Sequence, residues 1–321
     1  MTMFSRLAAA ACFVPAIGYC LPAAAQSFPS KVVTIIANTP PAGGTDLIAR
    51  IYANELAKRW GSSVVVDNRP GATGLLGAEV VVRAPADGHT LLMTPDSVMA
   101  QPLFRKMQFD AARDLVAIGV AMKSPQLCFT NTMTGFKTWQ DLVSYARANP
   151  GKLNYVDYPG VANHLYLRKM MKLSGITTTP VPYNGEAPGI QAVLAGTTQL
   201  FCTVFGTINQ HVQAGKAIAL AVTSPEPVSA FPGVPTMRSL GMDFEWSLAF
   251  VLMAPAALPR ELLARLQGDM AAVQNVPEVQ ARISATGLIP ETRAPQVTAA
   301  EWGSGAQKAR DMAREFNVQP E

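Results

Sequence analysis

The chain has 321 residues and a formal net charge of +4, with 26 Lys and Arg residues against 22 Asp and Glu residues. The basic residues form no run or stripe, so the composition argues against binding of nucleic acid or of an anionic membrane surface. Hydrophobic residues make up 49% of the sequence, and a chain of this length buries a sizeable core that is usually divided between two domains. Beyond the N-terminus, no stretch approaches the ~18 consecutive apolar residues of a transmembrane helix.

The first 25 residues have the pattern of a secretory signal peptide. A single charge at Arg6 precedes an apolar run over residues 7–17, and three alanines at positions 23–25 form a small-residue cleavage site. A membrane anchor is the alternative, but the run is short and is followed or interrupted by prolines and a glycine. We therefore expect residues 1–25 to be removed and the mature protein to be periplasmic.

Strand and helix patterns alternate in the first part of the chain. Residues 32–37 form a continuous run rich in β-branched side chains, which is typical of a strand covered on both faces. A Pro- and Gly-rich turn follows, and apolar residues then recur at helical spacing over residues 47–56. Further strands are predicted at residues 64–66 and 91–94, with a loop at 67–79 that leads into another helix. This βαβαβ order favours a parallel sheet with helices on both faces.

The pattern starts again after about residue 125. A capping-box sequence from Thr138 to Asp141 opens a helix that ends near Asn149. The other elements expected are strands at 127–131, 153–156, 179–183, 200–204 and 218–223, and helices from about 163, at 186–195, at 261–273 and at 300–316. We therefore predict an α/β protein with two lobes, each a doubly wound sheet with helices on both faces. Residues 26–124 and 223–321 are assigned to lobe 1, and residues 125–222 to lobe 2.

Two cysteines, Cys128 and Cys202, remain after the predicted cleavage, and each lies in an apolar, strand-like run. An oxidising periplasm would allow them to pair. Free buried thiols are the alternative. The sequence leaves both open, because it does not contain the Cα separation that a disulfide requires.

The turn after the first strand is the most informative loop. In doubly wound sheets, ligands bind outside the carboxyl ends of the strands. Gly43 and Gly44 allow a ligand to approach the backbone closely, and a helix follows at once, so its first amides lack partners. These features predict an anion site at residues 40–46, with an ordinary strand-to-helix connection as the alternative. The turn has neither a G-x-G-x-x-G pattern nor a Lys after the glycines, so it is no nucleotide-binding motif.

Polar side chains also lie in the other loops at these strand ends. Thr94 and Ser97 place hydroxyls at the end of the third strand. Asn163 is a candidate N-cap of the following helix, and His164 beside it either contacts a ligand or is structural. Glu186 opens another helix, where its charge complements the helix dipole.

The sequence contains no recognisable pattern of catalytic residues. The three histidines are far apart and lack the spacing of metal ligands, and there is no G-x-S-x-G motif. A triad assembled in space is the alternative that a sequence cannot exclude. Arg69 is the one cation of the candidate loops. A bound carboxylate is therefore expected to be held by backbone amides and helix starts.

Nine short segments, in this order, resemble the Bug receptors, the substrate-binding proteins of tripartite tricarboxylate transporters. The segments are FPSKVVTII, PPAGGTD, VVVDNRPGATG, ADGHTLLM, ANPGKLNY, VPYNGEAP, LAVTS, FPGVPT and LMAP. The likeness covers nearly the whole mature chain. It implies a type II periplasmic-binding-protein fold with hinge closure, and capture of a small carboxylate between the first strand–helix loop and the matching loop of the second lobe.

The resemblance and the strand ends together define a set of predicted ligand-binding residues. The first loop corresponds to residues 38–46 and the second to residues 158–164, with residues 184–187 beside it. The predicted contacts are Asn38, Thr39, Pro40, Ala42, Gly43, Gly44, Thr45, Asp46, Thr94, Ser97, Tyr158, Gly160, Val161, Ala162, Asn163, His164, Asn184, Glu186 and Ala187.

Two departures from the family pattern concern the ligand. Asn38, Thr39 and Ala42 stand where the family usually has Pro, Phe and Gly, and the second loop reads DYPGVAN, without the usual serine. We expect the general mode of binding to hold and the ligand to differ from a typical dicarboxylate. An apolar or aromatic acid is a candidate.

The sequence therefore predicts a monomeric receptor, and not an enzyme, that binds a small organic carboxylate without cofactor, metal or nucleic acid. It would deliver this ligand, a di- or tricarboxylate or an aromatic acid, to the membrane permease subunits of a tripartite tricarboxylate transporter. One alternative is a ligand-sensing receptor for a two-component system. Another is a secreted hydrolase or isomerase.

Overall fold

A computed structural model describes residues 28–183, 185–228, 231–286 and 288–320. The predicted signal peptide and the predicted ligand contact of Asn184 lie outside these residues.

Lobe 1 is built on three parallel strands. Its first elements are β1 (Val33–Ala37), α1 (Gly44–Trp60), β2 (Val64–Asn68), η1 (Ala72–Gly74), α2 (Leu75–Val82), β3 (Thr90–Pro95), η2 (Asp96–Leu103) and α3 (Ala111–Asp114). Strand β1 lies between β2 and β3 and pairs with both in parallel, which confirms the predicted βαβαβ arrangement. The sheet as a whole is mixed, because β3 also pairs antiparallel with β9 (Ser247–Pro255).

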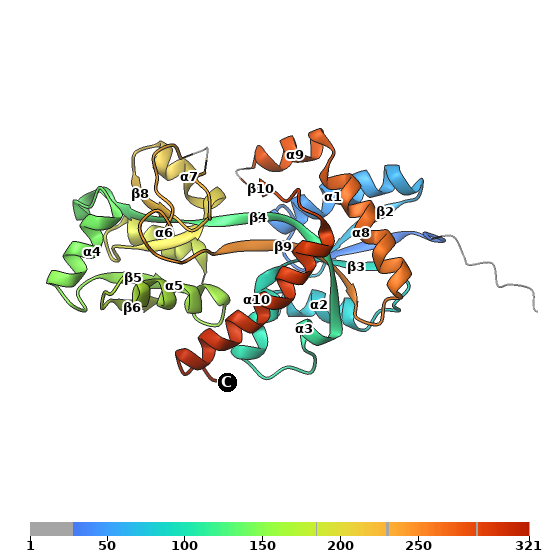
Figure 1. Cartoon of the computed structure of the whole chain (residues 1–321), viewed down its shortest axis with the longest axis horizontal. Helices are drawn as coiled ribbons and strands as arrows, with labels where there is room; N and C mark the ends of the chain where they lie inside the picture. The colour runs from blue at the N-terminus through green and yellow to red at the C-terminus, as the bar shows by residue number, and fades with distance from the viewer. Residues whose placement is uncertain (1–27, 184, 229–230, 287, 321) are drawn as a thin grey trace, which may run out of the picture.

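Two long antiparallel strands connect the lobes. Strand β4 (Leu115–Asn131) pairs with β9 from Leu115 opposite Pro255 to Pro125 opposite Ser247. Beyond Pro125, β4 continues into lobe 2, and Figure 1 shows both strands running between the two halves of the molecule. The strand predicted at 127–131 is only the end of β4, and the prediction contained no strand at β9.

The strands of lobe 2 form two groups, a separate two-stranded sheet and a pair that extends the sheet of β4. Its other elements are η3 (Thr132–Thr134), α4 (Trp139–Ala148), β5 (Asn154–Asp157), α5 (Ala162–Leu173), β6 (Thr179–Pro182), α6 (Glu186–Leu194), β7 (Phe201–Val204), α7 (Phe205–Gln213) and β8 (Ala217–Val222). Strands β5 and β6 pair in parallel, whereas β7 and β8 pair antiparallel with β4. The predicted capping box is present, since Thr138 and Asp141 exchange side-chain to backbone hydrogen bonds at the start of α4.

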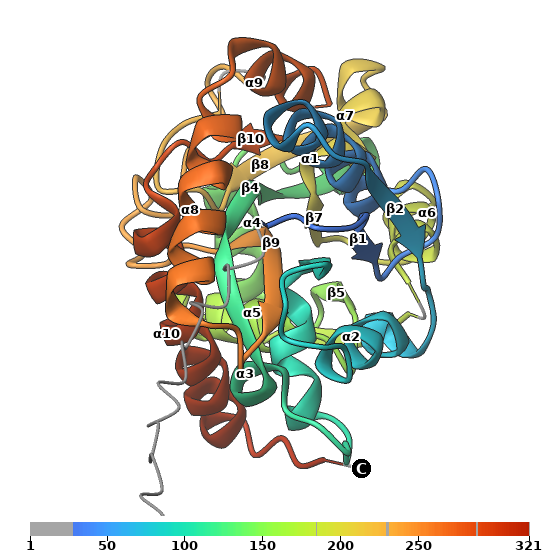
Figure 2. The same cartoon turned by 90° about the vertical axis from the view of Figure 1, so that its right-hand side faces the viewer.

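The C-terminal elements return to lobe 1 and cross toward lobe 2. They are α8 (Arg260–Gln274), α9 (Pro277–Ser284), β10 (Ile289–Pro290) and α10 (Pro295–Glu315). Helix α10 begins five residues before the predicted position, with Pro295 at its first turn, where proline is well tolerated. Figure 2 shows α8 and α10 alongside β4 and β9. The far end of α10 lies against α5, where Glu315 forms ion pairs with Lys169 and Lys172.

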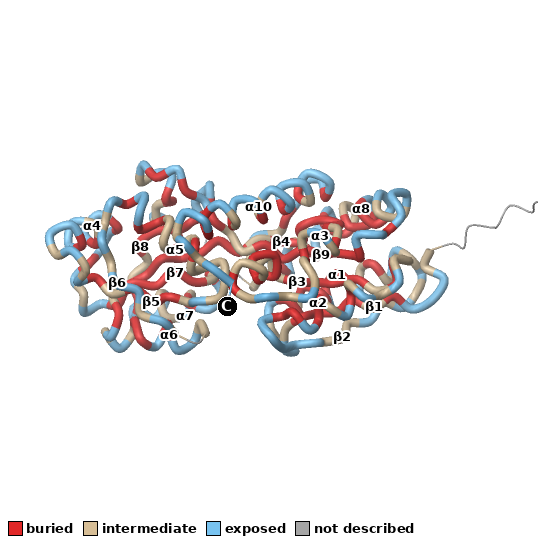
Figure 3. The backbone as a smooth tube through the Cα atoms, turned by 90° about the horizontal axis from the view of Figure 1, so that it is seen from below, coloured by how far each residue is buried: buried red, intermediate tan, exposed pale blue. Residues whose placement is uncertain are grey.

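Buried side chains occupy both faces of the sheet in each lobe. Figure 3 shows that the residues of the central strands are mostly buried. In lobe 1, α1 and α8 cover one face, and α2 and α10 cover the other. In lobe 2, Met237, Phe244 and Trp246 pack into the same cluster as α4 and α5. We therefore propose that lobe 1 resumes at Ser247, where β9 begins, rather than at residue 223.

Cys128 and Cys202 form a disulfide. They stand directly opposite one another in the antiparallel pairing of β4 with β7, and both side chains are fully buried. Of the two alternatives that the sequence left open, the structure has the disulfide, which ties β7 to the connecting strand.

Candidate ligand-binding site

The first predicted loop is held in shape by its own residues. Helix α1 begins at Gly44 with Gly43 as N-cap, and no side chain caps its first amides. The carboxylate of Asp46 instead reaches back to accept a hydrogen bond from the amide of Ala42, at 3.0 Å. Ala42 has a φ of +64°, in the left-handed region that favours glycine. The turn is therefore closed locally, and the first amides of α1 are left available for an anion.

Asp46 also connects the turn to the rest of the lobe. Its Oδ1 lies 2.9 Å from the guanidinium of Arg50, and this hydrogen-bonded cation lowers the pKa of the Asp46 carboxyl below its ordinary value. Arg50 donates in turn to Asn68 at 3.3 Å, and Asn68 donates to the carbonyl of Thr39 at 3.2 Å. Because Oδ2 of Asp46 accepts hydrogen bonds from both the Ala42 amide and the Arg50 guanidinium, Asp46 holds the shape of the loop.

Asn38 joins three loops beneath this turn. Its buried side-chain amide donates to the hydroxyl of Thr94 at 2.8 Å and to the carbonyl of Gly74 at 3.1 Å. Gly77 allows this approach, since a Cβ there would lie 2.7 Å from the Asn38 Cβ. The predicted residues Asn38 and Thr94 therefore lie together. The buried hydroxyl of Thr39 has no hydrogen-bond partner among the described residues.

His164, at the end of the second predicted loop, pairs with Asp157, the last residue of β5, which was not among the predicted residues. The Nδ1 of His164 lies 2.8 Å and 2.9 Å from the two Asp157 carboxylate oxygens, which orients the ring at the start of α5. On the other side, Nε2 lies 3.4 Å from the guanidinium of Arg168. Arg168 was not among the predicted residues, although its position one turn after His164 on the same helix was a usable signal.

The prediction that Asn163 caps α5 is wrong. The N-cap is Val161, and the helix already includes Asn163. The turn through Gly160, with a φ of +78°, brings the chain into the helix two residues earlier than expected. The Asn163 amide instead donates to the carbonyl of Cys202 at 3.3 Å, which ties α5 to β7.

Glu186 is the first residue of α6, as predicted, and its side chain is directed toward β7. Its Oε1 accepts hydrogen bonds from the Thr203 hydroxyl and, at 3.2 Å, from the Val204 amide. Burial raises the pKa of the Glu186 carboxyl and that of the Tyr158 hydroxyl, and the charge of Glu186 raises the pKa of Tyr158 further. The loops after β5 and β6 lie side by side, since the Tyr183 amide donates to the Asp157 carbonyl at 3.0 Å.

The contacts described next link the predicted loops to residues outside them. Gln101 in η2 donates to the carbonyl of Gly160 at 3.3 Å, which links lobe 1 to the second loop. Phe250 in β9 lies behind the first loop, 3.7 Å from where a Cβ of Gly44 would be. Sequence reasoning missed both Gln101 and Phe250, because neither belongs to a motif. The other predicted residues are half-buried or exposed in these loops, except Thr45, which is buried; they are Pro40, Gly43, Ser97, Val161, Ala162 and Ala187.

The described residues lack two features that would point to other classes of protein. In this part of the chain no helix is long and apolar enough to cross a membrane. Nor do three or more His, Cys, Asp or Glu side chains gather there in a way that could hold a metal ion.

Two strands join the two α/β lobes, and helices whose first amides lack a side-chain cap begin at the strand ends. This is the architecture of a solute-binding protein. A family model described as "Tripartite tricarboxylate transporter family receptor" matches residues 48–309. The chain belongs to this family of receptors.

Relatives of known structure and name agree with this assignment. Protein BugT from Bordetella pertussis is 28% identical over 321 residues, which covers 98% of each chain. The solved structure of Rhodopseudomonas palustris Rpa4515 with adipate has a TM-score of 0.77 at 27% identity, covering 92% of this chain and all of the other. MatC from Rhodopseudomonas palustris, solved with bound malate, has a TM-score of 0.71 at 26% identity, covering 89% and all of the respective chains.

Proposed function

We propose that this protein captures a small organic carboxylate between its two lobes and delivers it to the membrane permease subunits of a tripartite transporter. It does so as a monomer in the periplasm, as a receptor and not an enzyme. The observation that carries the proposal is the uncapped start of α1, which follows a Gly-rich turn held in place by Asp46. Rpa4515 with adipate and MatC with malate are relatives solved with carboxylates, which supports the class of ligand.

A rough balance of energies requires both lobes to hold the ligand. Removing a carboxylate from water costs several kcal/mol, whereas each hydrogen bond to it contributes about 1.5–3 kcal/mol and a helix start about 0.3–1 kcal/mol. Three or four donors are therefore needed. Lobe 1 offers the first amides of α1 and the Thr39 hydroxyl, and the start of α5 offers a second uncapped set. Binding would consequently favour the closed arrangement of the lobes.

The lining of lobe 2 bears on the kind of acid. Tyr158 and Val161, both half-buried, lie in the loop between β5 and α5, so this side of the site offers an aromatic ring and a branched aliphatic side chain. An acid with an apolar or aromatic body fits these groups better than a compact dicarboxylate does.

Calorimetry tests the proposal on mature protein freed of bound ligand by unfolding and refolding. We expect saturable heat and a thermal shift with at least one member of a panel that contains malate, adipate, benzoate and phenylacetate. Gly43→Val should weaken that binding at least tenfold, because a branched side chain would stand beside the first amides of α1 where the ligand is proposed to lie. Its Cβ alone would already contact the Pro40 carbonyl at 3.4 Å. The matched control is Gly268→Ala in α8, where no atom lies within 4 Å of the new Cβ.

Two outcomes would contradict the proposal. If no acid produced heat or a thermal shift, the proposal that the ligand is a small organic carboxylate would be rejected. Equal affinity of wild type and Gly43→Val would show that the ligand does not bind at the start of α1.

A further inference from the structure

A hollow of about 840 Å³ lies between the lobes beside α10, and we call it the α10 groove. Lobe 1 contributes side chains from η2, β4, β9, β10 and α10, and lobe 2 contributes side chains from α5 and from residues 224–228 and 245–246. None of the predicted carboxylate-binding residues lines it. Its volume is within the range of about 300–1,000 Å³ that is usual for small-molecule sites.

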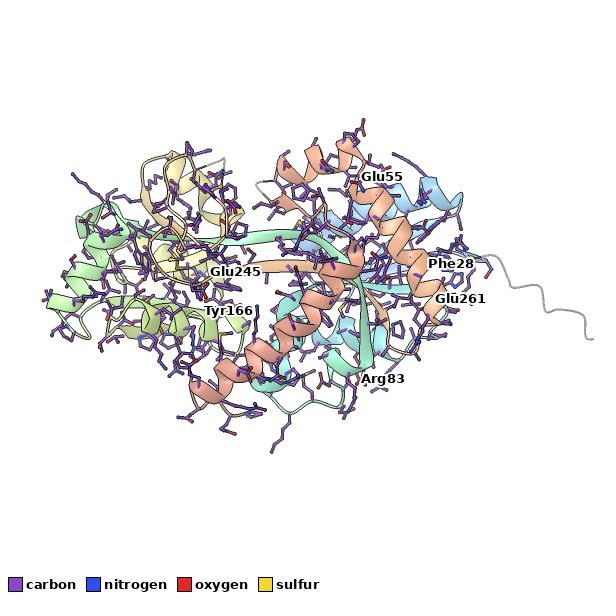
Figure 4. The ribbon with its side chains drawn as sticks, viewed as in Figure 1. Phe28, Glu55, Arg83, Tyr166, Glu245 and Glu261 are labelled. Carbon is purple, nitrogen blue, oxygen red and sulfur yellow. A yellow bond between two sulfur atoms is a disulfide. The ribbon has the colours of Figure 1, made fainter. Side chains whose placement is uncertain are left out.

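Aromatic side chains form two walls of the α10 groove. Tyr166 and Trp246 stack in parallel with 4.8 Å between ring centroids, and Figure 4 shows Tyr166 in the centre of the molecule, near Glu245. Trp302 on α10 also lines the groove and is 8% exposed. Its indole N–H has no acceptor among the described residues, so this wall has a donor that an occupant could satisfy.

The α10 groove is lined by more acidic than basic side chains. Five carboxylates line it against three cations. Arg293 lies 2.6 Å from Glu291 and 2.7 Å from Glu301, and Lys123 lies 3.7 Å from each of these acids, so this wall is locally neutral. Glu245 pairs at 3.1 Å with Arg238, which does not line the groove. The remaining lining acids are therefore Asp96 and Glu226, and the remaining cation is the exposed Lys308.

Asp96 is the acid that most lacks a counter-ion. It forms no ion pair with any described residue, and surrounding protein raises its pKa to about 7, despite the Ala249 amide and the more distant Lys123. The hydroxyl of Tyr166 is close enough for the Asp96 charge to raise the pKa of Tyr166 further. A carboxylate ligand is therefore disfavoured here, whereas a cation beside Asp96 would stabilise its charged form.

We propose that the α10 groove is a second binding site, separate from the carboxylate site, and that it takes a small organic ammonium ion with an aromatic or apolar body. The ammonium group would lie beside Asp96 and the edge of Tyr166, and the body against the faces of Trp302 and Val120. Because the walls come from both lobes, occupancy of this groove is coupled to the angle between them.

The probe is 2-phenylethylammonium, compared with neutral 2-phenylethanol and anionic 3-phenylpropionate. It is titrated into the mature protein at pH 8 while tryptophan fluorescence and heat are recorded. We expect saturable binding of the amine, with the alcohol and the acid at least tenfold weaker. Asp96→Asn should weaken amine binding at least fivefold. The matched control, Glu261→Gln on α8 in Figure 4, removes an exposed carboxylate that does not line the groove and should have no effect.

Three results would overturn the proposal: no saturable binding of the amine, equal binding of the amine and the alcohol, or equal affinity in wild type and Asp96→Asn. If Asp96→Asn does not fold, Glu226→Gln at an exposed position of the same lining replaces it and should weaken binding at least twofold. An unchanged affinity in that variant would equally reject the site.

Discussion

The carboxylate of Asp46 accepts a hydrogen bond from the amide of Ala42, four residues earlier, with 3.0 Å between Oδ2 and N. This contact closes the turn ahead of α1, and Arg50 holds the same carboxylate from the other side at 2.9 Å. A residue that a sequence comparison would place among the ligand contacts therefore acts first on the shape of the loop. The stability of this loop can be tested separately from ligand binding.

Asp46→Asn should lower the free energy of unfolding by about 1.5–3 kcal/mol at pH 7, because it removes a charged partner of Arg50 while keeping the shape of the side chain. Arg50 lowers the pKa of Asp46, so the wild-type contribution is present above the unfolded-state pKa and is lost as the pH falls through the folded-state pKa. The difference between the two proteins in urea unfolding should therefore shrink in acid. Glu55→Gln on the same helix is the matched control and should cost less than 1 kcal/mol, because among the described residues Glu55 pairs only with the exposed Lys58. A difference that is constant down to pH 2 would contradict this account.

Ala42→Gly should stabilise the protein by about 0.5–1 kcal/mol. The left-handed conformation at Ala42 costs a residue with a Cβ about 1–2 kcal/mol, and the extra freedom of glycine in the unfolded chain offsets part of that gain. Ala42→Val is the opposite test and should destabilise, because a β-branched side chain tolerates this φ least. Thermal unfolding of the two variants measures both effects, and a lower melting temperature for Ala42→Gly would show that the turn is not strained.

The mature protein should contain no free thiol. Cys128 and Cys202 close a loop with a sequence separation of 74, and a cross-link of that length stabilises by roughly 3–5 kcal/mol through the unfolded chain. Thiol titration in denaturant without reductant should find none, and the double variant Cys128→Ser with Cys202→Ser should unfold at lower urea concentration than wild type. Reductant should shift the wild type and leave the double variant unchanged. Two titratable thiols in the unreduced protein would refute the disulfide.

Local patterns were enough to predict much of the fold. The three parallel strands of lobe 1 and the capping box at Thr138 depend on short-range signals, and both are present. The strands that connect the lobes depend on pairing between residues more than a hundred positions apart, such as Leu115 with Pro255. Gly119 and Pro125 interrupt β4 in the sequence, and only its partner β9 shows that the strand continues through them.

The candidate site likewise has a part that the sequence could predict and a part that it could not. The loops at the strand ends follow from topology, so the positions of Asn38 and Thr94 were predictable. The close packing of Gly77 beneath Asn38 was not predictable, because Gly77 comes from a helix whose packing the sequence does not show. Arg168 differs, since its spacing from His164 on one helix was a signal that could have been used. The α10 groove was beyond prediction for the same reason, since segments from many parts of the chain form its walls.

Asp96→Asn should stabilise the protein at pH 8 and not at pH 4. The pKa of Asp96 is raised from 3.8 to about 7, so between these values the folded protein keeps a proton that the unfolded chain releases. Stability therefore falls as the pH rises from about 4 to 7, by at most about 4 kcal/mol at 1.36 kcal/mol per pKa unit. Asparagine carries no charge to desolvate, so the variant escapes this loss. Urea unfolding of wild type and Asp96→Asn at pH 4 and pH 8 measures this difference in stability. Glu261→Gln is the control and should follow wild type at both pH values. If Asp96→Asn is destabilised equally at pH 4 and pH 8, the Asp96 carboxylate is well solvated in the groove, and the need for a counter-ion there disappears.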